Sequence, residues 1–250
     1  MLEGDWTPLE GGNVNTVAQR GEVVRRQLNA ASPAVHELLG RLEQLGVPFT
    51  PRLQGSDKHY EYLGFLPGQA VFRPWPAAVL SDLWLTDLGA WLRAYHDAAH
   101  GFRVQKTFLW GPREPIDEMI ICHGDLGPWN CLHQGGRLSG VIDWDLARYG
   151  QPLDDVAELV LEAVPLHNRL TETLGGASQK VRAARLEAFC RAYGVAVQKV
   201  LNHVPSYLQM VIDDTRESAI RGSEPFAAFE QGGIVTSLET DLRDYERTWG

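Results

Sequence analysis

The residue types best suited to chemistry lie between positions 120 and 145. Asp125 precedes Asn130 by five residues, and Asp143 follows in the next apolar segment. Carboxylate and amide oxygens are ligands that Mg²⁺ accepts, and a carboxylate beside a hydroxyl group can orient it and take its proton. Phosphoryl transfer uses these parts, because in that reaction a protein mainly positions the reactants and neutralises charge.

A hairpin is expected to bring two of these side chains together. Gly135–Gly136 lies between apolar runs, which is a signal for a two-residue hairpin loop. Counting outward from that loop places Asn130 opposite Val141, so Asp143 projects from the same face of the ribbon as Asn130. Asp125 lies on a loop that glycine and proline make non-helical, so its carboxylate can sit beside the same site. The sequence therefore predicts a magnesium site next to a catalytic carboxylate.

The motifs around these residues resemble those of the aminoglycoside phosphotransferase family (phosphotransferase enzyme family), within the protein-kinase-like fold. The matching segments are His-Gly-Asp at 123–125 with Asn130, and Ile-Asp-Trp-Asp at 142–145. Protein kinases carry the related motifs H-R-D-x-x-x-x-N and D-F-G. The resemblance implies that Asp125 is the catalytic base and that Asn130 and Asp143 are the metal ligands.

Supporting roles follow from the same resemblance. It implies that Asp145 is an auxiliary polar residue of the site, although Asp145 could instead be the N-cap of a following helix. Residues 150–157 are similar to the family motif G-D-P-x-x-D-L-A, whose second Asp braces the catalytic loop, and this assigns Asp155 a supporting role. Gln151 departs from the usual Asp of that motif. His123 is expected to order the backbone by hydrogen bonding rather than to transfer protons.

The nucleotide base is expected to bind where two lobes join. The segment 65–68 resembles the inter-lobe hinge of the family, and residues 88–96 resemble its helix ending in a histidine that faces the small lobe. The resemblance implies that backbone groups near Gly64, Phe65 and Leu66 hold the base of ATP or GTP.

The phosphate-binding residues depart from the family pattern. The family uses a strand lysine paired with a helix glutamate, whereas the strand at 22–26 offers only arginines. Arg25 or Arg26 points inward, and we favour Arg25 because it follows Val23 at the offset of the family lysine. Arginine can grip phosphate with two nitrogens, although it does not simply replace lysine.

Two further features complete the expected nucleotide site. Glu37 on the next helix is the expected ion-pair partner of the arginine, with His36 as the alternative. The segment 11–13 is Gly-Gly-Asn. Gly12 and Asn13 are expected to lie over the phosphates, because glycine lets backbone N–H groups approach an anion.

Other polar and aromatic residues leave alternatives open. Trp129 could stack on a substrate or pack against the helical part. A group of acidic residues on predicted helices could receive a cationic substrate or form solvated helix faces. These residues are Glu158, Glu162, Asp213, Asp214 and Glu217.

Hydrophobic periodicity predicts a β-rich start followed by helices. Two strands are expected within 11–26 and two within 49–66, the second pair with a Gly-Ser-Asp turn at 55–57. Ser32 at the N-cap and Pro33 at the first helical position begin a helix that ends at residue 46. Further helices are predicted over 81–99, 153–163, 178–193, 195–218 and 234–247.

This order predicts an α+β fold, bilobal and protein-kinase-like. The small β-rich N-terminal lobe would comprise residues 1–67 and bind the nucleotide. The larger, mainly α-helical C-terminal lobe would comprise residues 68–250 and hold the catalytic residues and the substrate.

Composition limits the classes of function. The 250 residues carry a net charge of −9, which argues against binding to a nucleic-acid backbone. No stretch approaches the 18 or so apolar residues of a membrane span, and residues 1–20 lack the apolar region of a signal peptide. The three cysteines form no C-x-x-C pair, so neither disulfides nor zinc is indicated. We expect a cytoplasmic protein with no nucleic-acid or membrane partner.

The sequence thus predicts a Mg²⁺-dependent phosphotransferase that moves the γ-phosphoryl group of ATP or GTP to a hydroxyl of a small molecule. An aminoglycoside-like cation is among the candidate acceptors. The alternative is a nucleotide-binding pseudokinase or scaffold, because the lysine is missing and the glycine loop is short. A protein kinase is less favoured, since no A-P-E element follows Asp143.

Overall fold

The computed structural model describes residues 5–9, 17–108, 111, 115–116, 118–167, 176–222 and 226–250. The chain forms two compact units. The first unit comprises Met1–Val71 and Trp91–Pro152, and the second comprises Phe72–Ala90 and Leu153–Gly250. This division groups the central segment with the N-terminal strands, so it differs from the predicted boundary at 67–68, which stays a prediction.

The described strands all lie in the first unit. Five of them form an antiparallel sheet in the order β1-β2-β3-β5-β4. The two pairs predicted within 11–26 and 49–66 account for four of these five strands. The bounds are β1 Thr7–Pro8, β2 Ala18–Arg20, β3 Val23–Gln27, β4 Leu53–Ser56 and β5 Tyr60–Gly64.

The β4–β5 hairpin turns later than predicted. Residues 55 and 56 belong to β4, and the turn is closed by Asp57 instead of the Gly-Ser-Asp segment. The Asp57 carboxylate accepts hydrogen bonds from the backbone N–H groups of His59 and Tyr60, both at 2.8 Å. This side-chain acceptor fixes the turn without glycine at its centre.

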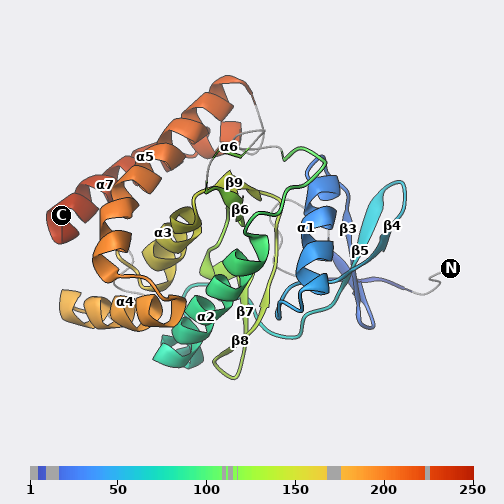
Figure 1. Cartoon of the computed structure of the whole chain (residues 1–250), viewed down its shortest axis with the longest axis horizontal. Helices are drawn as coiled ribbons and strands as arrows, with labels where there is room; N and C mark the ends of the chain where they lie inside the picture. Colours follow the sequence, from blue (N-terminus) through green and yellow to red (C-terminus); the bar gives the residue numbers. More distant parts are fainter. Residues whose placement is uncertain are drawn as a thin grey trace. The chain divides into compact units, whose positions relative to one another are not determined.

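Helix α1 (Ser32–Gln44) lies beside this sheet (Figure 1). Its buried face includes Val35, Leu38 and Leu42, as the periodicity predicted. The predicted N-cap is wrong, because Ala31 occupies that position. The side chain of Asn29 supplies the capping acceptor to the N–H groups of residues 31 and 32, at 2.8 and 3.1 Å.

Two short antiparallel pairs form the centre of the first unit. β6 (Ile120–Cys122) pairs with β9 (Arg148–Gly150), and β7 (Cys131–Gln134) pairs with β8 (Arg137–Val141). The predicted Gly-Gly hairpin loop between β7 and β8 is confirmed. The predicted register is wrong by one residue at its far end, because a bulge after Leu132 pairs Val141 with Cys131 instead of Asn130.

An aromatic cluster supports this central segment. Helix α2 (Asp82–Ala99) contributes Trp91 and Tyr95, whose rings stack with centroids 5.5 Å apart. Both rings contact Trp144, and the Tyr95 hydroxyl donates to the backbone oxygen of Ile121. The segment before residue 145 is thereby packed on helix α2.

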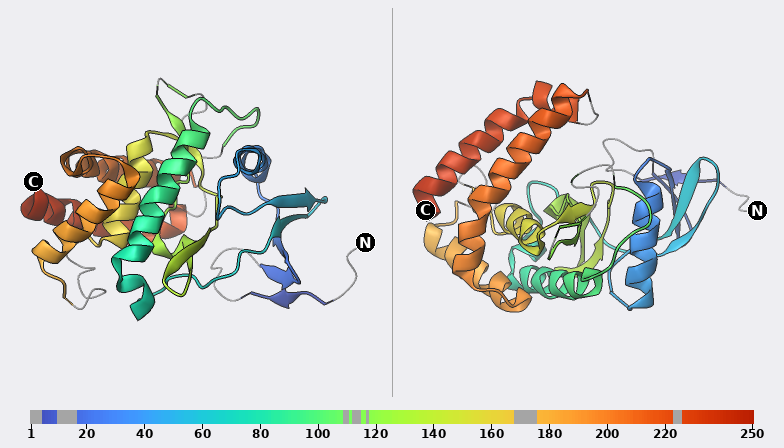
Figure 2. Two further views of the ribbon diagram at one scale, coloured as in Figure 1. Left: turned by 60° about the horizontal axis from the view of Figure 1, so that its bottom comes forward. Right: turned by 45° about the horizontal axis from the view of Figure 1, so that its top comes forward.

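The second unit is helical in its described residues. Helices α5 and α7 run side by side in both figures of the whole chain (Figures 1 and 2), and the Tyr245 hydroxyl donates to the Leu201 oxygen at 2.9 Å. The five predicted helices are confirmed to within two residues, whereas α6 was not predicted. None of the described helices has the length and hydropathy needed to cross a membrane. The bounds are η1 Ala77–Leu80, α3 Pro152–Ala163, α4 Gln179–Tyr193, α5 Val197–Ile220, α6 Phe226–Gln231 and α7 Ile234–Trp249.

Candidate active site

The loop that carries Asp125 depends on a glycine. Gly124 has a φ of +79°, and a Cβ atom added there would lie 2.1 Å from the backbone oxygen of Leu146. Only glycine permits both this conformation and this close approach. The loop after β6 is therefore held against the turn at 145–146, which brings the segment at 123–125 close to the segment at 142–145.

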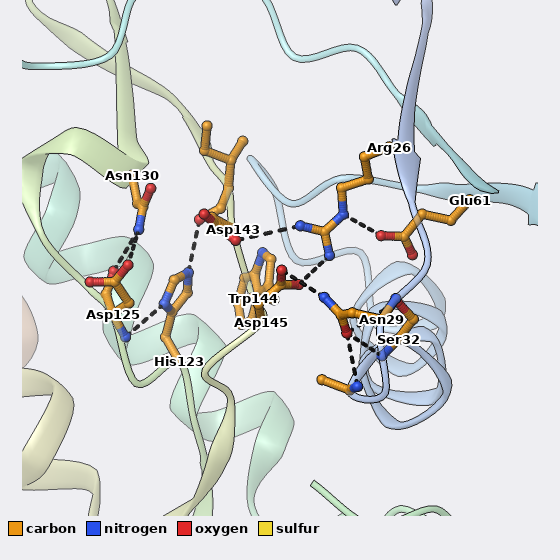
Figure 3. A network of polar contacts seen from close by, with 12 residues as sticks. Arg26, Asn29, Ser32, Glu61, His123, Asp125, Asn130, Asp143, Trp144 and Asp145 are labelled. Carbon is orange, nitrogen blue, oxygen red and sulfur yellow. Dashed lines mark hydrogen bonds and ion pairs between the residues drawn. The ribbon is translucent and has the colours of Figure 1, made fainter. Parts of the chain in front are cut away.

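His123 connects the two motifs by hydrogen bonds (Figure 3). Its ring is buried, and Nδ1 accepts from the backbone N–H of Asp125 at 3.3 Å. Because Nδ1 accepts, Nε2 carries the proton of the neutral ring and donates to the Ile142 oxygen at 3.1 Å. His123 thus links the residue before Asp143 to Asp125.

The carboxylate of Asp125 is oriented by two donors. The Asn130 side-chain nitrogen donates to Oδ2 at 2.8 Å, and the Trp129 indole donates to Oδ1 at 3.3 Å. The Trp129 ring also lies over Gly127, where an added Cβ would be 2.2 Å from it. The sequence predicts that Trp129 stacks on a substrate or packs against the helical part, and it gives no signal for the contact with Asp125.

The same contacts fix the orientation of the Asn130 amide. Its nitrogen donates to both the carboxylate and the backbone oxygen of Asp125, at 2.8 and 2.9 Å. The nitrogen must therefore face Asp125, so the amide oxygen points away from it, as Figure 3 shows. An oxygen in that position can act as a metal ligand.

Asp143 has the features of a carboxylate prepared for a cation. Its φ is +64°, and about half of its side chain is exposed (49%). Desolvation by the surrounding protein, together with the negative charge of Asp145, raises the pKa of Asp143 above its usual value. A cation beside Asp143 would relieve both effects.

Arg26 on β3 is the cation nearest these carboxylates among the described residues. Its guanidinium donates to Glu61, to Asp145 and, at 3.4 Å, to Asp143. Burial of Arg26 opposes its charge, but the carboxylates of Asp145, Glu61 and Asp143 outweigh this and raise its pKa. Arg26 is therefore a permanent positive charge inside an acidic cluster.

The prediction that Arg25 points towards the site is wrong. Its guanidinium lies over the rings of Trp6 and Tyr60, 4.5 and 4.6 Å from their centroids. Neighbouring residues of a strand point to opposite faces, so Arg25 and Arg26 cannot both face the carboxylates. The offset of the family lysine selected the wrong member of the pair.

The predicted partner Glu37 is also wrong. Its carboxylate accepts a hydrogen bond from the backbone N–H of Gln105 at 2.6 Å. The partner of Arg26 is Glu61, the residue directly across from it on β5. His36, the predicted rival of Glu37, bonds to Glu61 instead of to the arginine. The available signal was the spacing of Glu61 and Leu63, because residues two apart on a strand share a face and both side chains are buried.

The environment of Glu61 keeps it ionised. Its side chain is almost fully buried, which alone would raise its pKa, but the hydrogen bond from His36 and the charge of Arg26 outweigh burial and lower the pKa. The pair of Glu61 with Arg26 is thus a buried ion pair anchored in the sheet.

Asp145 joins the same network. It accepts hydrogen bonds from Arg26 and, at 2.8 Å, from the side-chain nitrogen of Asn29. The alternative that Asp145 caps a helix is wrong, because a turn and then β9 follow it. Asn29 was missed, since a single asparagine before a helix gives no sign of a long-range contact. Figure 3 shows Asn29 between the start of α1 and Asp145.

The predicted hinge has part of its backbone already engaged. The N–H of Gly64 donates to Arg52 at 2.8 Å, and the N–H of Phe65 donates to Glu22 at 2.9 Å. No described residue accepts a hydrogen bond from the N–H of Leu66. Of the three predicted base-binding residues, Leu66 is therefore the one whose N–H is not engaged by another described residue.

Several predicted residues are not tested by this geometry. Gly12 and Asn13 lie outside the described residues. Asp155 is buried in the first turn of α3, in the second unit, and its bracing role stays a prediction. Among the acidic residues of the helices, the exposed Glu217 contacts the exposed Arg221, as an ordinary surface ion pair does. Glu162 is largely buried and contacts Arg73 and, at 3.6 Å, the buried His167.

The residues fit a Mg²⁺ ion that arrives with phosphates. Three carboxylates, those of Glu61, Asp143 and Asp145, share one guanidinium, so two negative charges are left uncompensated when His36 is counted as neutral. No group of three or more His, Cys, Asp or Glu side chains arranged to hold a metal occurs in the described part of the chain. Mg²⁺ commonly binds through one or two carboxylates and takes its other ligands from water and phosphate.

The sequence of this chain is similar to those of known proteins. The model of the Phosphotransferase enzyme family matches residues 108–202, which contain the whole Asp125–Asp143 region. The Trifolitoxin immunity protein of Rhizobium leguminosarum bv. trifolii is 29% identical over 220 residues, which cover 84% of this chain and 82% of that protein.

Solved structures show the same fold at low identity. The amicoumacin kinase hAmiN, in complex with AMP-PNP, Ca2+ and Ami, superposes with a TM-score of 0.67 at 12% identity, covering 96% of this chain and 88% of that one. A choline/ethanolamine kinase family protein from Mesorhizobium loti gives a TM-score of 0.60 at 16% identity, covering 98% and 92%.

These findings define the class of protein. The predicted α+β, protein-kinase-like fold is confirmed, and so is the resemblance to the aminoglycoside phosphotransferases. The match to the phosphotransferase enzyme family covers residues 108–202 of the chain.

Proposed function

We propose that this chain is a small-molecule kinase that transfers the γ-phosphoryl group of ATP to a hydroxyl group in the presence of Mg²⁺. The observation that carries the proposal is the oriented set of Asp125, Asn130 and Asp143, tied together through His123. A polar turn without chemistry would not need a carboxylate aligned by two donors beside a second carboxylate whose pKa is raised.

Asp125 would align the acceptor hydroxyl and take its proton. The hydroxyl oxygen attacks the γ-phosphorus, the bond from that phosphorus to the β,γ-bridging oxygen breaks, and the proton passes to a carboxylate oxygen of Asp125. The donors Trp129 and Asn130 hold that carboxylate in one orientation before the acceptor arrives. Such preorganisation lowers the barrier, because no side chain has to be reoriented during the reaction.

Asn130 and Asp143 would hold Mg²⁺ through the amide oxygen and the exposed carboxylate. When bound, Mg²⁺ would neutralise charge on the β- and γ-phosphates. Arg26 would supply further positive charge, in the place that we had expected for Arg25. The amide of Leu66 would donate to the base, and we favour ATP because hAmiN is a fold relative in complex with AMP-PNP.

The acceptor is proposed to be a hydroxylated small molecule of the antibiotic or toxin type. One relative is named for immunity to trifolitoxin, and one structural neighbour is an amicoumacin kinase. Neither likeness identifies the acceptor, so a panel of hydroxylated compounds is the appropriate probe.

The test is nucleotide consumption by the purified chain with Mg²⁺-ATP or Mg²⁺-GTP across such a panel, including aminoglycosides. Asp125→Asn keeps the shape of the side chain but removes the base, so acceptor-dependent ADP release should fall to background. Asp97→Asn is the matched control, because Asp97 is an exposed carboxylate of α2 that contacts Arg93. Equal turnover in wild type and Asp125→Asn would refute the assignment.

A second candidate is a nucleotide-binding pseudokinase. The observation in its favour is that Arg26, the arginine of β3 that faces Asp143, is engaged by three carboxylates. Thermal stabilisation by ATP analogues without turnover on any acceptor would favour this candidate over the kinase.

A further inference from the structure

The guanidinium of Arg26 divides its nitrogens among three carboxylates. Nε donates to Glu61, one terminal nitrogen donates to Asp145, and the other lies 3.4 Å from Asp143 (Figure 3). Only about a tenth of the Arg26 side chain is exposed (10%), whereas half of Asp143 is exposed (49%). Arg26 therefore reaches the predicted metal ligand from the protein interior, while the opposite side of Asp143 is open.

Glu61 fixes Arg26 in this position. The two residues are paired across β3 and β5, and the carboxylate of Glu61 is also bonded to His36. A guanidinium held at Nε by a buried partner can rotate little, so its terminal nitrogens stay directed at Asp143 and Asp145. Arg25, one residue earlier, carries the same charge on the opposite face of the strand.

The charge of Arg26 should change the affinities for a metal ion and for a nucleotide in opposite directions. Its positive charge compensates part of the carboxylate charge that would attract a divalent cation, and it repels that cation directly. The same charge attracts the phosphates of a nucleotide bound at Asp143. A residue that only supported the fold would not separate these two effects.

We propose that Arg26 couples metal binding to nucleotide binding, by weakening the binding of a divalent cation alone and strengthening the binding of the nucleotide. As a consequence of this coupling, the divalent cation binds appreciably only together with the phosphates of the nucleotide. The nucleotide half of this inference rests on the proposed function, whereas the metal half depends only on the contacts of Arg26 with Asp143 and Asp145.

The test uses the full chain, Mn²⁺ as the metal probe and AMP-PNP as the nucleotide probe. Free Mn²⁺ is followed by electron paramagnetic resonance, and AMP-PNP binding is followed by calorimetry at fixed Mg²⁺. In Arg26→Gln, Mn²⁺ alone should bind on the order of tenfold tighter, the size expected for one unit charge removed near the metal. AMP-PNP should bind on the order of tenfold weaker, because a charged phosphate contact is lost. Arg25→Gln is the matched control and should change neither affinity.

Two variants keep the test decisive if Arg26→Gln does not fold. The double variant Arg26→Gln with Glu61→Gln removes both members of the buried pair, so no unpaired buried charge remains. It should tighten Mn²⁺ binding less than Arg26→Gln does, because loss of the Glu61 charge, which lies on the Nε side of Arg26 away from Asp143, offsets part of the effect. Arg26→Lys retains the charge and should leave Mn²⁺ binding within about twofold of wild type, since charge governs that affinity.

Mn²⁺ binding that is unchanged or weaker in the folded Arg26→Gln or double variant overturns the proposal. The same holds if Arg25→Gln tightens Mn²⁺ binding as much as Arg26→Gln does. If the wild type binds no AMP-PNP, the coupling to nucleotide and the proposed function are both refuted, and tighter Mn²⁺ binding would then leave only the metal half standing.

Discussion

Replacing Gly68 by alanine tests whether the connector after the predicted hinge is held against the β7–β8 hairpin. Gly68 has a φ of +147°, and an added Cβ would lie 2.3 Å from the Ser139 hydroxyl oxygen and 3.1 Å from the His133 backbone oxygen. The next residue, Gln69, exchanges two backbone hydrogen bonds with His133, at 3.0 and 2.9 Å. The connector therefore cannot move aside without losing its hydrogen bonds to β7.

Two separate effects of Gly68→Ala should lower the free energy of unfolding. A non-glycine residue in this region of φ costs about 1–3 kcal/mol. Forcing an extra carbon into a packed contact costs about 1–3 kcal/mol more, because Ser139 or the backbone must shift. The expected loss is about 2–6 kcal/mol, a large part of the net stability of a folded domain.

Equilibrium unfolding in urea measures this loss, and Gly55→Ala is its control. Gly55 has the same φ of +147°, but nothing lies within 4 Å of its added Cβ. Gly55→Ala should therefore show only the backbone cost of about 1–3 kcal/mol. The difference between the two variants gives the cost of the contact with β7 and β8.

A double-mutant cycle identifies the clashing atom. The Ser139 hydroxyl oxygen is buried and makes no hydrogen bond to a described residue, so Ser139→Ala alone should cost little. Combined with Gly68→Ala, it should recover about 1 kcal/mol or more, because the nearest obstructing atom is gone. The reasoning is refuted if Gly68→Ala costs no more than Gly55→Ala, or if Ser139→Ala gives no recovery.

Two further predictions concern hydrogen bonds to carboxylates. Trp129→Phe removes the indole donor to Asp125, so in steady-state kinetics kcat should fall by about tenfold with little change in KM for ATP; an unchanged kcat would contradict the orienting role. Hydrogen bonds from the Tyr62 hydroxyl and from the backbone N–H groups of His59 and Tyr60 lower the pKa of Asp57 to about 2. Because this pKa lies below the unfolded value near 4, the stability difference between wild type and Asp57→Asn in urea unfolding should be constant above about pH 4 and vanish as the pH falls through 2; a difference that persists at pH 2 would show that the carboxylate charge is not responsible.

The features that the sequence predicted correctly depend on neighbours along the chain. The Gly-Gly loop at 135–136 forms because glycine adopts positive φ angles at low cost, whichever tertiary structure surrounds it. Helix α1 follows from apolar residues at helical spacing. The motif spacing that pointed to Asp125 and Asn130 is equally local, because five residues separate them on one loop.

The features that failed depend on the register between strands. Strand alternation says that Arg25 and Arg26 face opposite ways, but it does not say which of them faces the carboxylates. That choice is fixed by the pairing of β3 with β5, which sets Arg26 against Glu61. The bulge after Leu132 is also a feature of strand register that the sequence did not predict. One extra residue there changes every pairing beyond it.

The position of Glu61 changes how the phosphate-binding cation would be held. In the family pattern that the motifs resemble, a helix glutamate holds the strand lysine, so the helix position affects the grip on phosphate. In this chain the residue that holds the cation Arg26 is Glu61, which lies on β5, the strand next to β3. The contact from helix α1 is made by His36, which bonds to Glu61 and not to Arg26. A shift of α1 would therefore disturb one partner of Glu61 and leave the pairing of Arg26 with the sheet in place. The geometry favours a nucleotide site in which the position of Arg26 is determined by the pairing of β3 with β5.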